Sequence, residues 1–306
     1  MTPMTGQRIP VRLAERSYEI LLEPGSSRAL GDRLKRLIDT AKVGIVTDRH
    51  VARHYLKPTV DSLKQAGFDV MSLANNHAGD FGDYGRTSTR KTLDDLGIKH
   101  AGSDKEQFST TYLEVKGKRV AFVGFAHNNI VPNVNDLDTA RRLVTEAKKH
   151  ADLVVVSFHG GGEGTDHQHV LNQTEIFIGE ARGNLPAFAH TVIDAGADLV
   201  LGHGPHVMRG LEVYKGHLIC YSLGNFATYG MFSLRAETAL TEILEITIGA
   251  DGKFISGKIV PGKQEGKGGP QLDPSNAAIR VVRNLSIADF GVNAPKIADD
   301  GTVTPK

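Results

Sequence analysis

Two asparagines and a histidine stand together where an apolar run of the chain ends. The run is V-M-S-L-A, residues 70–74, and Asn75, Asn76 and His77 follow it directly. An amide and an imidazole delivered together by one strand are groups suited to metal or phosphate chemistry. The pattern therefore predicts a chemical site at the end of this strand.

Two later apolar runs end in the same way. The first, L-V-V-V-S-F-H-G-G-G-E, ends with His159 and Glu163, and the second, A-D-L-V-L-G-H-G-P-H, ends with His203 and His206. The carboxyl ends of parallel strands gather at one crevice of a sheet, so we expect these residues to meet there. The predicted site set is Asn76, His77, His159, His203 and His206.

These side chains define the chemistry that the site could perform. Zinc, manganese and iron ions accept neutral imidazole, amide oxygen and carboxylate as ligands. A bound ion would lower the pKa of a water molecule and polarise a phosphoryl or carbonyl oxygen. A spare histidine could then protonate the leaving group.

A purely structural role is the alternative for each motif. Asparagine suits a strand-to-helix loop, and the glycines around His203 and His206 suit a tight turn as well as the close approach of a ligand. Glu163 is expected either to support a histidine or to be a solvated loop charge, and His167 and His169 lie in a polar loop. Six other histidines are predicted to be surface or core residues: His50, His54, His100, His150, His190 and His217.

The composition bounds the class of protein. The 306 residues carry 36 basic and 35 acidic side chains, so nucleic acid is not an expected partner. The chain has an apolar content of 40% and 34 glycines, which is typical of a loop-rich α/β protein. Its single cysteine, Cys220, stands in an apolar run, so we expect a buried thiol.

No run has the length of a membrane span or the form of a signal peptide, so we expect a soluble, cytoplasmic chain. The expected partner is a small-molecule or polymer substrate, and the oligomeric state stays open.

Strand-like and helical segments alternate along the chain, which predicts an α/β fold with a parallel sheet. Strands are expected at 68–73, 111–116, 119–125, 153–158 and 199–202, and helices at 85–96, 137–149 and 185–195. Four further strands between residues 211 and 259 resemble a meander. Residues 263–274 are expected to form a linker-like loop before a last helix at 275–285. The residues from Val292 onward are expected to be weakly ordered.

From residue 68 to the end, the sequence resembles the poly-γ-glutamate capsule-synthesis (CapA-type) family, which is related to calcineurin-like metallophosphatases. The matching motifs are S-L-A-N-N-H-A-G-D-F-G at 72–82, H-G-G-G-E at 159–163, G-A-D-L-V-L-G-H-G-P-H at 196–206 and Y-S-L-G-N-F at 221–226. The resemblance implies an α/β/β/α sandwich with a two-metal site. It makes Asn76, His159, His203 and His206 metal ligands, and it makes His77 the leaving-group acid or transition-state stabiliser.

Residues 10–67 resemble a different family, the amino-terminal part of 3-dehydroquinate synthase, whose first domain binds NAD. The motifs V-R-L-A-E-R-S-Y-E-I, L-G-D-R-L-K-R-L and K-V-G-I-V-T-D carry this resemblance. We therefore interpret the chain as a hybrid of a synthase-like fragment, residues 1–67, and a metallophosphatase-like domain, residues 68–306. The fragment would contribute a Rossmann-like βαβ segment that completes the sheet. NAD binding is a further hypothesis, but the fragment lacks the parts that a working synthase needs.

The acidic ligands that the metallophosphatase-like family supplies near its amino terminus are missing where the resemblance would place them. Asp48, at the end of a predicted strand, is a candidate replacement, whereas Asp80 and Asp83 stand in the wrong chain order. Without a bridging carboxylate, two close metal ions would repel each other, so one divalent ion (Mn, Fe or Zn) or none is expected. Two functions stay open: a metal-dependent hydrolase acting by water attack on a phosphoryl or acyl centre, and a non-catalytic hybrid with an incomplete metal site.

Overall fold

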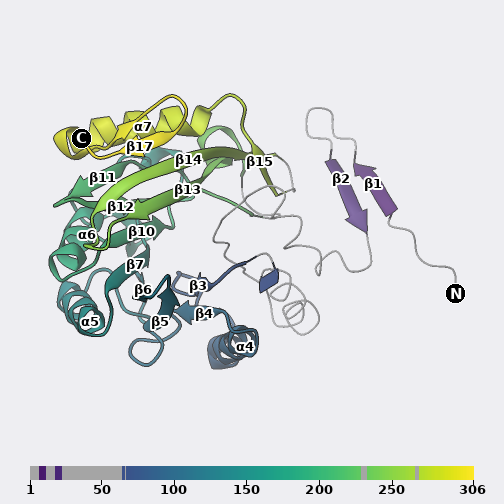
Figure 1. The fold of residues 1–306 in the computed structure, drawn as a ribbon. Coiled ribbons are helices and arrows are strands. Elements are labelled where there is room, and N and C mark those ends of the chain that lie inside the picture. Colours follow the sequence, from purple (N-terminus) through teal and green to yellow (C-terminus); the bar gives the residue numbers. More distant parts are fainter. Residues whose placement is uncertain (1–6, 12–17, 23–63, 66, 229–232, 266–268) are drawn as a thin grey trace, which may run out of the picture.

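Two β-sheets packed face to face form the centre of the molecule (Figure 1). The computed structural model describes residues 7–11, 18–22, 64–65, 67–228, 233–265 and 269–306. The first sheet has the strand order β11-β12-β10-β7-β6-β5. Its strands are β5 (Thr110–Val115), β6 (Lys118–Ala126), β7 (Leu153–His159), β10 (Leu199–His203), β11 (Leu211–Tyr214) and β12 (His217–Cys220).

The second sheet has the order β13-β14-β17-β16, with β15 paired to β14. Its strands are β13 (Leu240–Ile248), β14 (Phe254–Gln264), β15 (Pro270–Leu272), β16 (Lys296–Ile297) and β17 (Thr302–Thr304).

Helices α5 (Leu137–Lys149) and α6 (Leu185–Asp194) pack on one face of the first sheet. Helix α5 begins at Asp136, whose side chain accepts a hydrogen bond from the backbone N–H of Thr139 at 3.0 Å. This bond satisfies one of the amide groups that a helix start leaves unpaired. The buried residues of α5 recur at helical spacing, so a single apolar face meets the sheet: Ala140, Leu143, Val144 and Ala147.

The central strands are buried on both faces. In β7, Val154, Val156 and Phe158 belong to the core under α5 and α6, whereas Val155 belongs to the core between the sheets. Because side chains alternate along a strand, His159 shares its face with Val155 and not with Phe158. The strand therefore presents His159 on the side of the first sheet that is turned away from α5 and α6.

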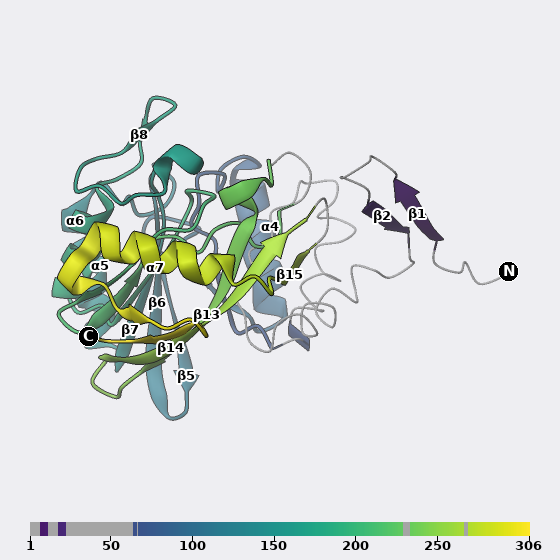
Figure 2. The ribbon, with the colours of Figure 1, turned by 90° about the horizontal axis from the view of Figure 1, so that it is seen from above.

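Helix α7 (Ala277–Phe290) runs along β11 at the edge of the first sheet and also contacts β14 (Figures 1 and 2). The Ser286 hydroxyl oxygen accepts a hydrogen bond of 2.8 Å from the backbone N–H of Leu211. Gly210 allows this approach, because a Cβ at that position would lie 2.9 Å from the backbone of Ser286. A helix in this position covers an edge that would otherwise expose unpaired backbone groups.

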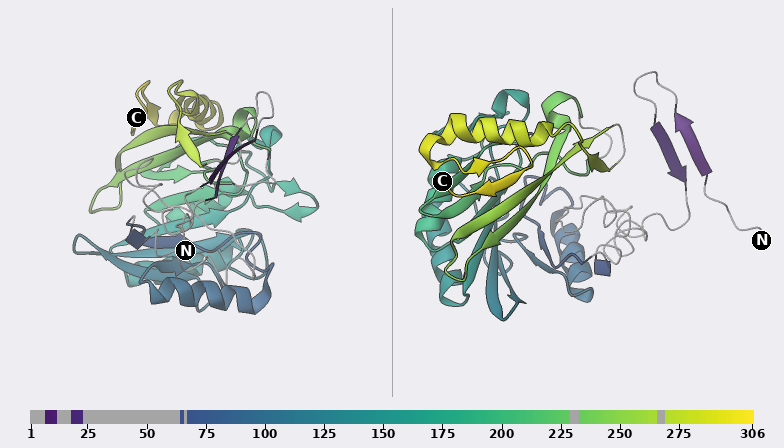
Figure 3. Two further views of the ribbon diagram at one scale, coloured as in Figure 1. Left: turned by 90° about the vertical axis from the view of Figure 1, so that its right-hand side faces the viewer. Right: turned by 45° about the horizontal axis from the view of Figure 1, so that its top comes forward.

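Smaller elements lie outside the two sheets, and Figure 3 shows the fold from two further directions. Helix α4 (Gly82–Asp95) joins a short parallel pair, β3 (Val70–Ser72) and β4 (Lys99–Ala101). Two hairpins are formed by β1 (Gln7–Val11) with β2 (Tyr18–Leu22) and by β8 (Ile176–Phe177) with β9 (Glu180–Ala181). The 3₁₀ turns within the described ranges are η3 (Thr165–His167), η4 (Ala236–Ala239) and η5 (Gly291–Asn293). Among the described helices, none is both long and apolar enough to cross a membrane.

The α/β class predicted from the sequence is confirmed, but three local expectations are wrong. The strands between residues 211 and 259 do not form one meander, because β11 and β12 belong to the first sheet and β13 and β14 to the second. Residues 263–274 are not a simple linker, because β14 continues to Gln264 and β15 pairs with it. The residues after Val292 are not weakly ordered, since β16 and β17 pair with each other and β17 pairs with β14. Most of the predicted βαβ segment of residues 1–67 lies outside the described residues, which include only β1, β2 and residues 64–65 and 67 from it.

Glu242 places an acid in the apolar interior between the sheets. Leu240 and Leu244 of β13 pack against this core, and strand alternation puts Glu242 on the same face, opposite Pro261 of β14. Glu242 is 3% exposed, and neither carboxyl oxygen has a hydrogen-bond partner within the described part of the chain.

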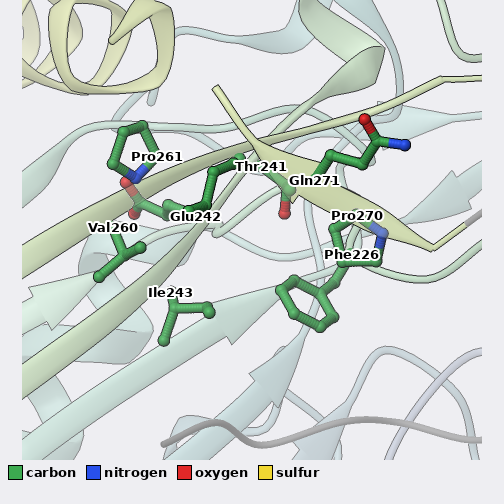
Figure 4. A pocket seen from close by; sticks show the side chains of 10 residues that line it. Phe226, Thr241, Glu242, Ile243, Val260, Pro261, Pro270 and Gln271 are labelled. Atoms are coloured by element: carbon green, nitrogen blue, oxygen red, sulfur yellow. The ribbon is translucent and has the colours of Figure 1, made fainter. Parts of the chain in front are cut away.

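Burial raises the pKa of Glu242 to about 8. Burial and the nearby Glu242 also raise the pKa of the buried Cys220 thiol well above its usual value. Glu242 further borders a small pocket with Phe226 and Ile243 (Figure 4). A charge here would be desolvated with no compensating partner, so the fold favours the neutral acid.

We predict that Glu242→Gln removes a pH dependence of stability. Below the ordinary pKa of 4.5 both the folded and unfolded states hold the proton, and between 4.5 and about 8 only the folded state does. Stability of the native chain should therefore fall as pH rises through this window, by at most about 1.4 kcal/mol per pH unit, and should level off above it. Urea unfolding followed by circular dichroism at pH 5 to 9 gives the free energies of unfolding of the variant and the native chain. The free energy of the variant minus that of the native chain should increase with pH, and Glu245→Gln on the exposed face of β13 is the control. A difference that stays constant with pH would contradict the prediction.

Candidate metal centre

His159 and His203 lie side by side at the carboxyl ends of β7 and β10. The two strands are parallel and pair residue for residue, ending with His203 opposite His159. The ring centroids are 5.0 Å apart and the rings stand at 82° to each other. The strand register thus brings together two of the predicted site residues, which are 44 positions apart in the sequence.

The His159 ring has the properties of a neutral metal ligand. The residue is 6% exposed, and neither ring nitrogen has a hydrogen-bond partner among the described residues. Burial first, and the neighbouring His203 second, lower the pKa of His159 well below its usual value. A buried imidazole without partners is costly unless a ligand uses its lone pair, so the position fits a bound metal ion.

His203 is held by the segment that precedes the two asparagines. Its Nε2 lies 3.2 Å from the backbone oxygen of Ala74. A carbonyl can only accept, so Nε2 carries the proton and Nδ1 keeps the lone pair. Burial lowers the pKa of His203 to about 4, which keeps the ring neutral at physiological pH. This contact joins the end of the β3 segment to the end of β10.

His206 is oriented by Asn225. The amide nitrogen of Asn225 donates to the backbone oxygens of His206 and Thr238 at 2.9 and 3.0 Å, so the amide oxygen faces Nδ1 of His206 at 2.7 Å. Nδ1 therefore donates, and the tautomer presents the lone pair on Nε2. This is the arrangement by which neighbouring groups orient metal-binding histidines. It also holds His206 in a left-handed backbone conformation, with φ of 58°.

The asparagine segment forms a turn above these histidines. Asn75 accepts a 2.7 Å hydrogen bond from the backbone N–H of His77 through its side chain, and its backbone oxygen accepts one from the Asn128 amide, also at 2.7 Å. The His77 ring is 60% exposed and its Nδ1 lies 2.8 Å from Asp80. Asn76 is half-buried in the same turn. The structure therefore ties this turn to His203, and it leaves His77 at the surface.

His127 lies beside the predicted site residues, although the sequence motifs did not point to it. It is buried next to His159, with ring centroids 5.6 Å apart, and its Nε2 lies 3.4 Å from a carboxylate oxygen of Glu180. Burial first and Arg182 second lower its pKa. His127 directly follows β6, so the rule that pointed to His159 and His203, a histidine where an apolar strand ends, applies to it as well.

Glu163 fits neither of its predicted roles. One oxygen lies 2.8 Å from Nη1 of Arg182, and the Glu163 side chain is only 25% exposed, so it is neither a histidine partner nor a solvated charge. Arg182 is itself buried and also pairs with Glu180 at 2.9 Å. The two acids and Arg182 thus form a compact ion network beside His127.

Other histidines hold the fold together. His169 pairs with Asp289 of α7, His190 pairs with the buried Glu212, and His100 pairs with Asp94. The His167 ring packs edge-on against Phe177. The remaining described histidines away from the cluster bind backbone or carboxylate groups: His150 and His217. His50 and His54 lie outside the described residues.

The described residues do not by themselves form a complete metal centre. Across the described ranges, no three histidine, cysteine, aspartate or glutamate side chains lie close enough together to hold a metal ion. His159 and His203 supply neutral imidazoles and His206 a suitable tautomer. A complete donor set would therefore need Asn76, a rearrangement of His206, or a residue outside the described part of the chain.

The comparisons with known proteins place this chain in a family. The model of the bacterial capsule synthesis protein family PGA_cap matches residues 47–229, and the chain belongs to this family. The PGA biosynthesis protein CapA of Bacillus subtilis (strain 168) is 33% identical over 210 residues, which are 64% of this chain and 52% of that protein. The chain spans about half the length of the capsule-synthesis relatives of this kind that it matches.

Two further similarities concern other proteins. The 3-dehydroquinate synthase of Rhizobium meliloti (strain 1021) is 38% identical over 71 residues, which are 23% of this chain and 19% of that enzyme. A crystal structure of a hypothetical protein from Thermus thermophilus covers 78% of this chain and 95% of its own, with 20% identity and a TM-score of 0.48. The synthase match is short and partial, so it leaves the hybrid interpretation a hypothesis.

We predict that Gly161→Ala destabilises the protein more than Gly97→Ala does. Both glycines have positive φ, 87° and 67°, but only at Gly161 would a Cβ meet a neighbour, the buried Arg209 guanidinium at 2.9 Å. The backbone penalty alone is roughly 1–2 kcal/mol, and the clash should bring the loss at Gly161 to roughly 2–4 kcal/mol. Urea denaturation of both variants measures the free energies of unfolding. Equal losses of stability in the two variants would show that the loop after His159 accommodates a Cβ at position 161 without a clash.

Proposed function

We propose that this chain is a metal-dependent hydrolase-like protein of the CapA type, which activates water for attack on a phosphoryl or acyl centre. The observation that carries the proposal is His159, a buried and neutral imidazole with no hydrogen-bond partner among the described residues. The centroid of its ring lies 5.0 Å from the ring centroid of a second neutral imidazole, His203. A metal ion would use the lone pairs that the fold leaves without partners.

The roles follow from chemistry and position. Asn76, His159, His203 and His206 would hold one divalent ion, Mn, Fe or Zn, which when bound lowers the pKa of water and polarises the substrate. Asn225 fixes the tautomer of His206. His77 would act as the acid, and its exposed ring beside Asp80 leaves it accessible to a substrate entering from solvent. The substrate class proposed is a small molecule or a polymer.

Asp48 is the proposed source of a carboxylate ligand. The family match begins at residue 47 and so includes Asp48, although this residue lies outside the described part of the chain. A carboxylate would supply the charge that three histidines and an amide lack, since these donors are all neutral. With Asp48 the centre would hold its one ion more tightly than the neutral donors alone.

The alternative proposal is a non-catalytic hybrid in which residues 1–67 derive from a 3-dehydroquinate synthase and residues 68–306 from a CapA-type protein. The incomplete donor set within the described residues and the partial synthase match support it. NAD binding by residues 1–67 is a third proposal. It predicts a saturable change on titration with NAD, and a titration without such a change would remove it.

Elemental analysis of the purified chain tests the leading proposal. We expect about one Mn, Fe or Zn ion per chain, and we expect His203→Ala to remove it because His203 is one of the buried neutral donors. His150→Ala is the matched control, since His150 lies at the end of α5 and pairs with Glu146. A metal-free native chain whose thermal stability does not change on chelation or on addition of Mn²⁺ would favour the non-catalytic alternative.

A further inference from the structure

A buried ion pair lies next to the loop that follows His159. Arg209 is fully buried and binds Glu175 through two parallel hydrogen bonds of 2.8 and 2.7 Å, one from each terminal nitrogen. Glu175 is 6% exposed. The two-pronged geometry is the strongest that arginine and a carboxylate can form, and it fixes direction as well as distance.

The pair holds Gly162, in the loop that follows His159, from both sides. The backbone N–H of Gly162 donates to Glu175 at 2.7 Å, and its backbone oxygen accepts from Arg209 at 3.3 Å. Both polar groups of one loop residue are therefore bound by the two members of the same ion pair. The ion pair therefore helps to fix the backbone at Gly162, three residues after His159.

Arg209 also belongs to the other histidine segment. It comes three residues after His206, and its backbone N–H donates to the Ser222 oxygen at 3.0 Å. Two backbone hydrogen bonds of 2.9 Å connect the loops directly, from Gly160 to His203 and from Gly164 to Pro205. The ion pair thus joins the loop after β7 to the segment after β10.

Stability alone does not account for such a pair. Desolvating two charges costs free energy that their attraction only partly returns, and apolar replacements of similar volume are often neutral or stabilising. The contacts with Gly162 point instead to a requirement for geometry. We propose that Arg209 and Glu175 are positioning residues, which hold the loop of His159 in register with the segment of His203 and His206 so that the histidines can share one ligand. This inference rests on the proposed function in that the shared ligand is a metal ion.

The double substitution Arg209→Met with Glu175→Leu separates positioning from stability, because it removes both charges and leaves none buried alone. Lys148→Met with Asp198→Leu is the matched control. Asp198 is buried, pairs with Lys148 at 2.8 Å and accepts from the backbone N–H of Val154 at 2.7 Å, but it lies at the opposite ends of β7 and β10. Arg209→Lys is a third variant, which keeps the charge and loses the two-pronged geometry.

Titration of each full-length chain with Mn²⁺ alone, at a temperature where circular dichroism shows it folded, measures the affinity. We expect the Arg209 and Glu175 double variant and Arg209→Lys to bind Mn²⁺ at least about tenfold more weakly, as for other groups that orient metal ligands. The control pair should leave the affinity unchanged even where it lowers the melting temperature. Native affinity in the folded double variant would overturn the inference.

Hydrogen exchange tests the positioning role if the native chain binds no Mn²⁺, because it needs no metal ion. The proposed function is tested separately, by elemental analysis for Mn, Fe and Zn. The amide of Gly160 donates to His203 and touches neither member of the ion pair, so its exchange rate reports the register of the two segments. Faster exchange at Gly160 in the double variant than in the control supports the inference. Equal rates in the two variants would overturn it.

Discussion

The pairing of β7 with β10 is the constraint on which the site depends. Parallel strands in this register set His159 opposite His203, and strand alternation turns both rings to the face away from α5 and α6. A slip of one residue would move every side chain of a strand to the opposite face. The apolar residues that fix the register, such as Val154, Val156 and Val200 in the core under the helices, therefore also fix the position of the imidazoles.

Burial gives these imidazoles their chemical character. An exposed histidine titrates near neutral pH, but a desolvated one loses its proton affinity and keeps its lone pairs available. His203, with a pKa lowered to about 4, and His159 are kept neutral by the same interior that holds their strands. Glu242 is the acidic counterpart between the sheets, where burial favours the neutral carboxyl group. One low-dielectric interior thus suppresses the charge of both kinds of group.

The sequence predicted the elements that local patterns encode. The uninterrupted apolar run of residues 153–158 and the 3.6-residue spacing in α5 were sufficient to place β7 and its covering helix, and the histidines after two strands were sufficient to predict that His159 and His203 would meet. Asn225 and Arg209 could not be found in this way, because their roles arise from contacts across 19 and 34 to 47 positions. The pairing of β17 with β14 was missed for the same reason, since short strands carry little periodicity of their own.

The neutrality of the cluster has a further consequence for what the chain can bind. Two or three imidazoles and an amide can hold one divalent cation, but they do not offset its charge. The acids beside His127 and Gly162 are paired with arginine. Glu163 and Glu180 pair with Arg182, and Glu175 pairs with Arg209. Recruiting Glu175 would leave the buried Arg209 guanidinium without its carboxylate partner, which is strongly unfavourable, and recruiting Glu163 or Glu180 would leave Arg182 with one of its two. A carboxylate ligand for such an ion would therefore have to come from elsewhere in the chain, and the family match that begins at residue 47 includes Asp48.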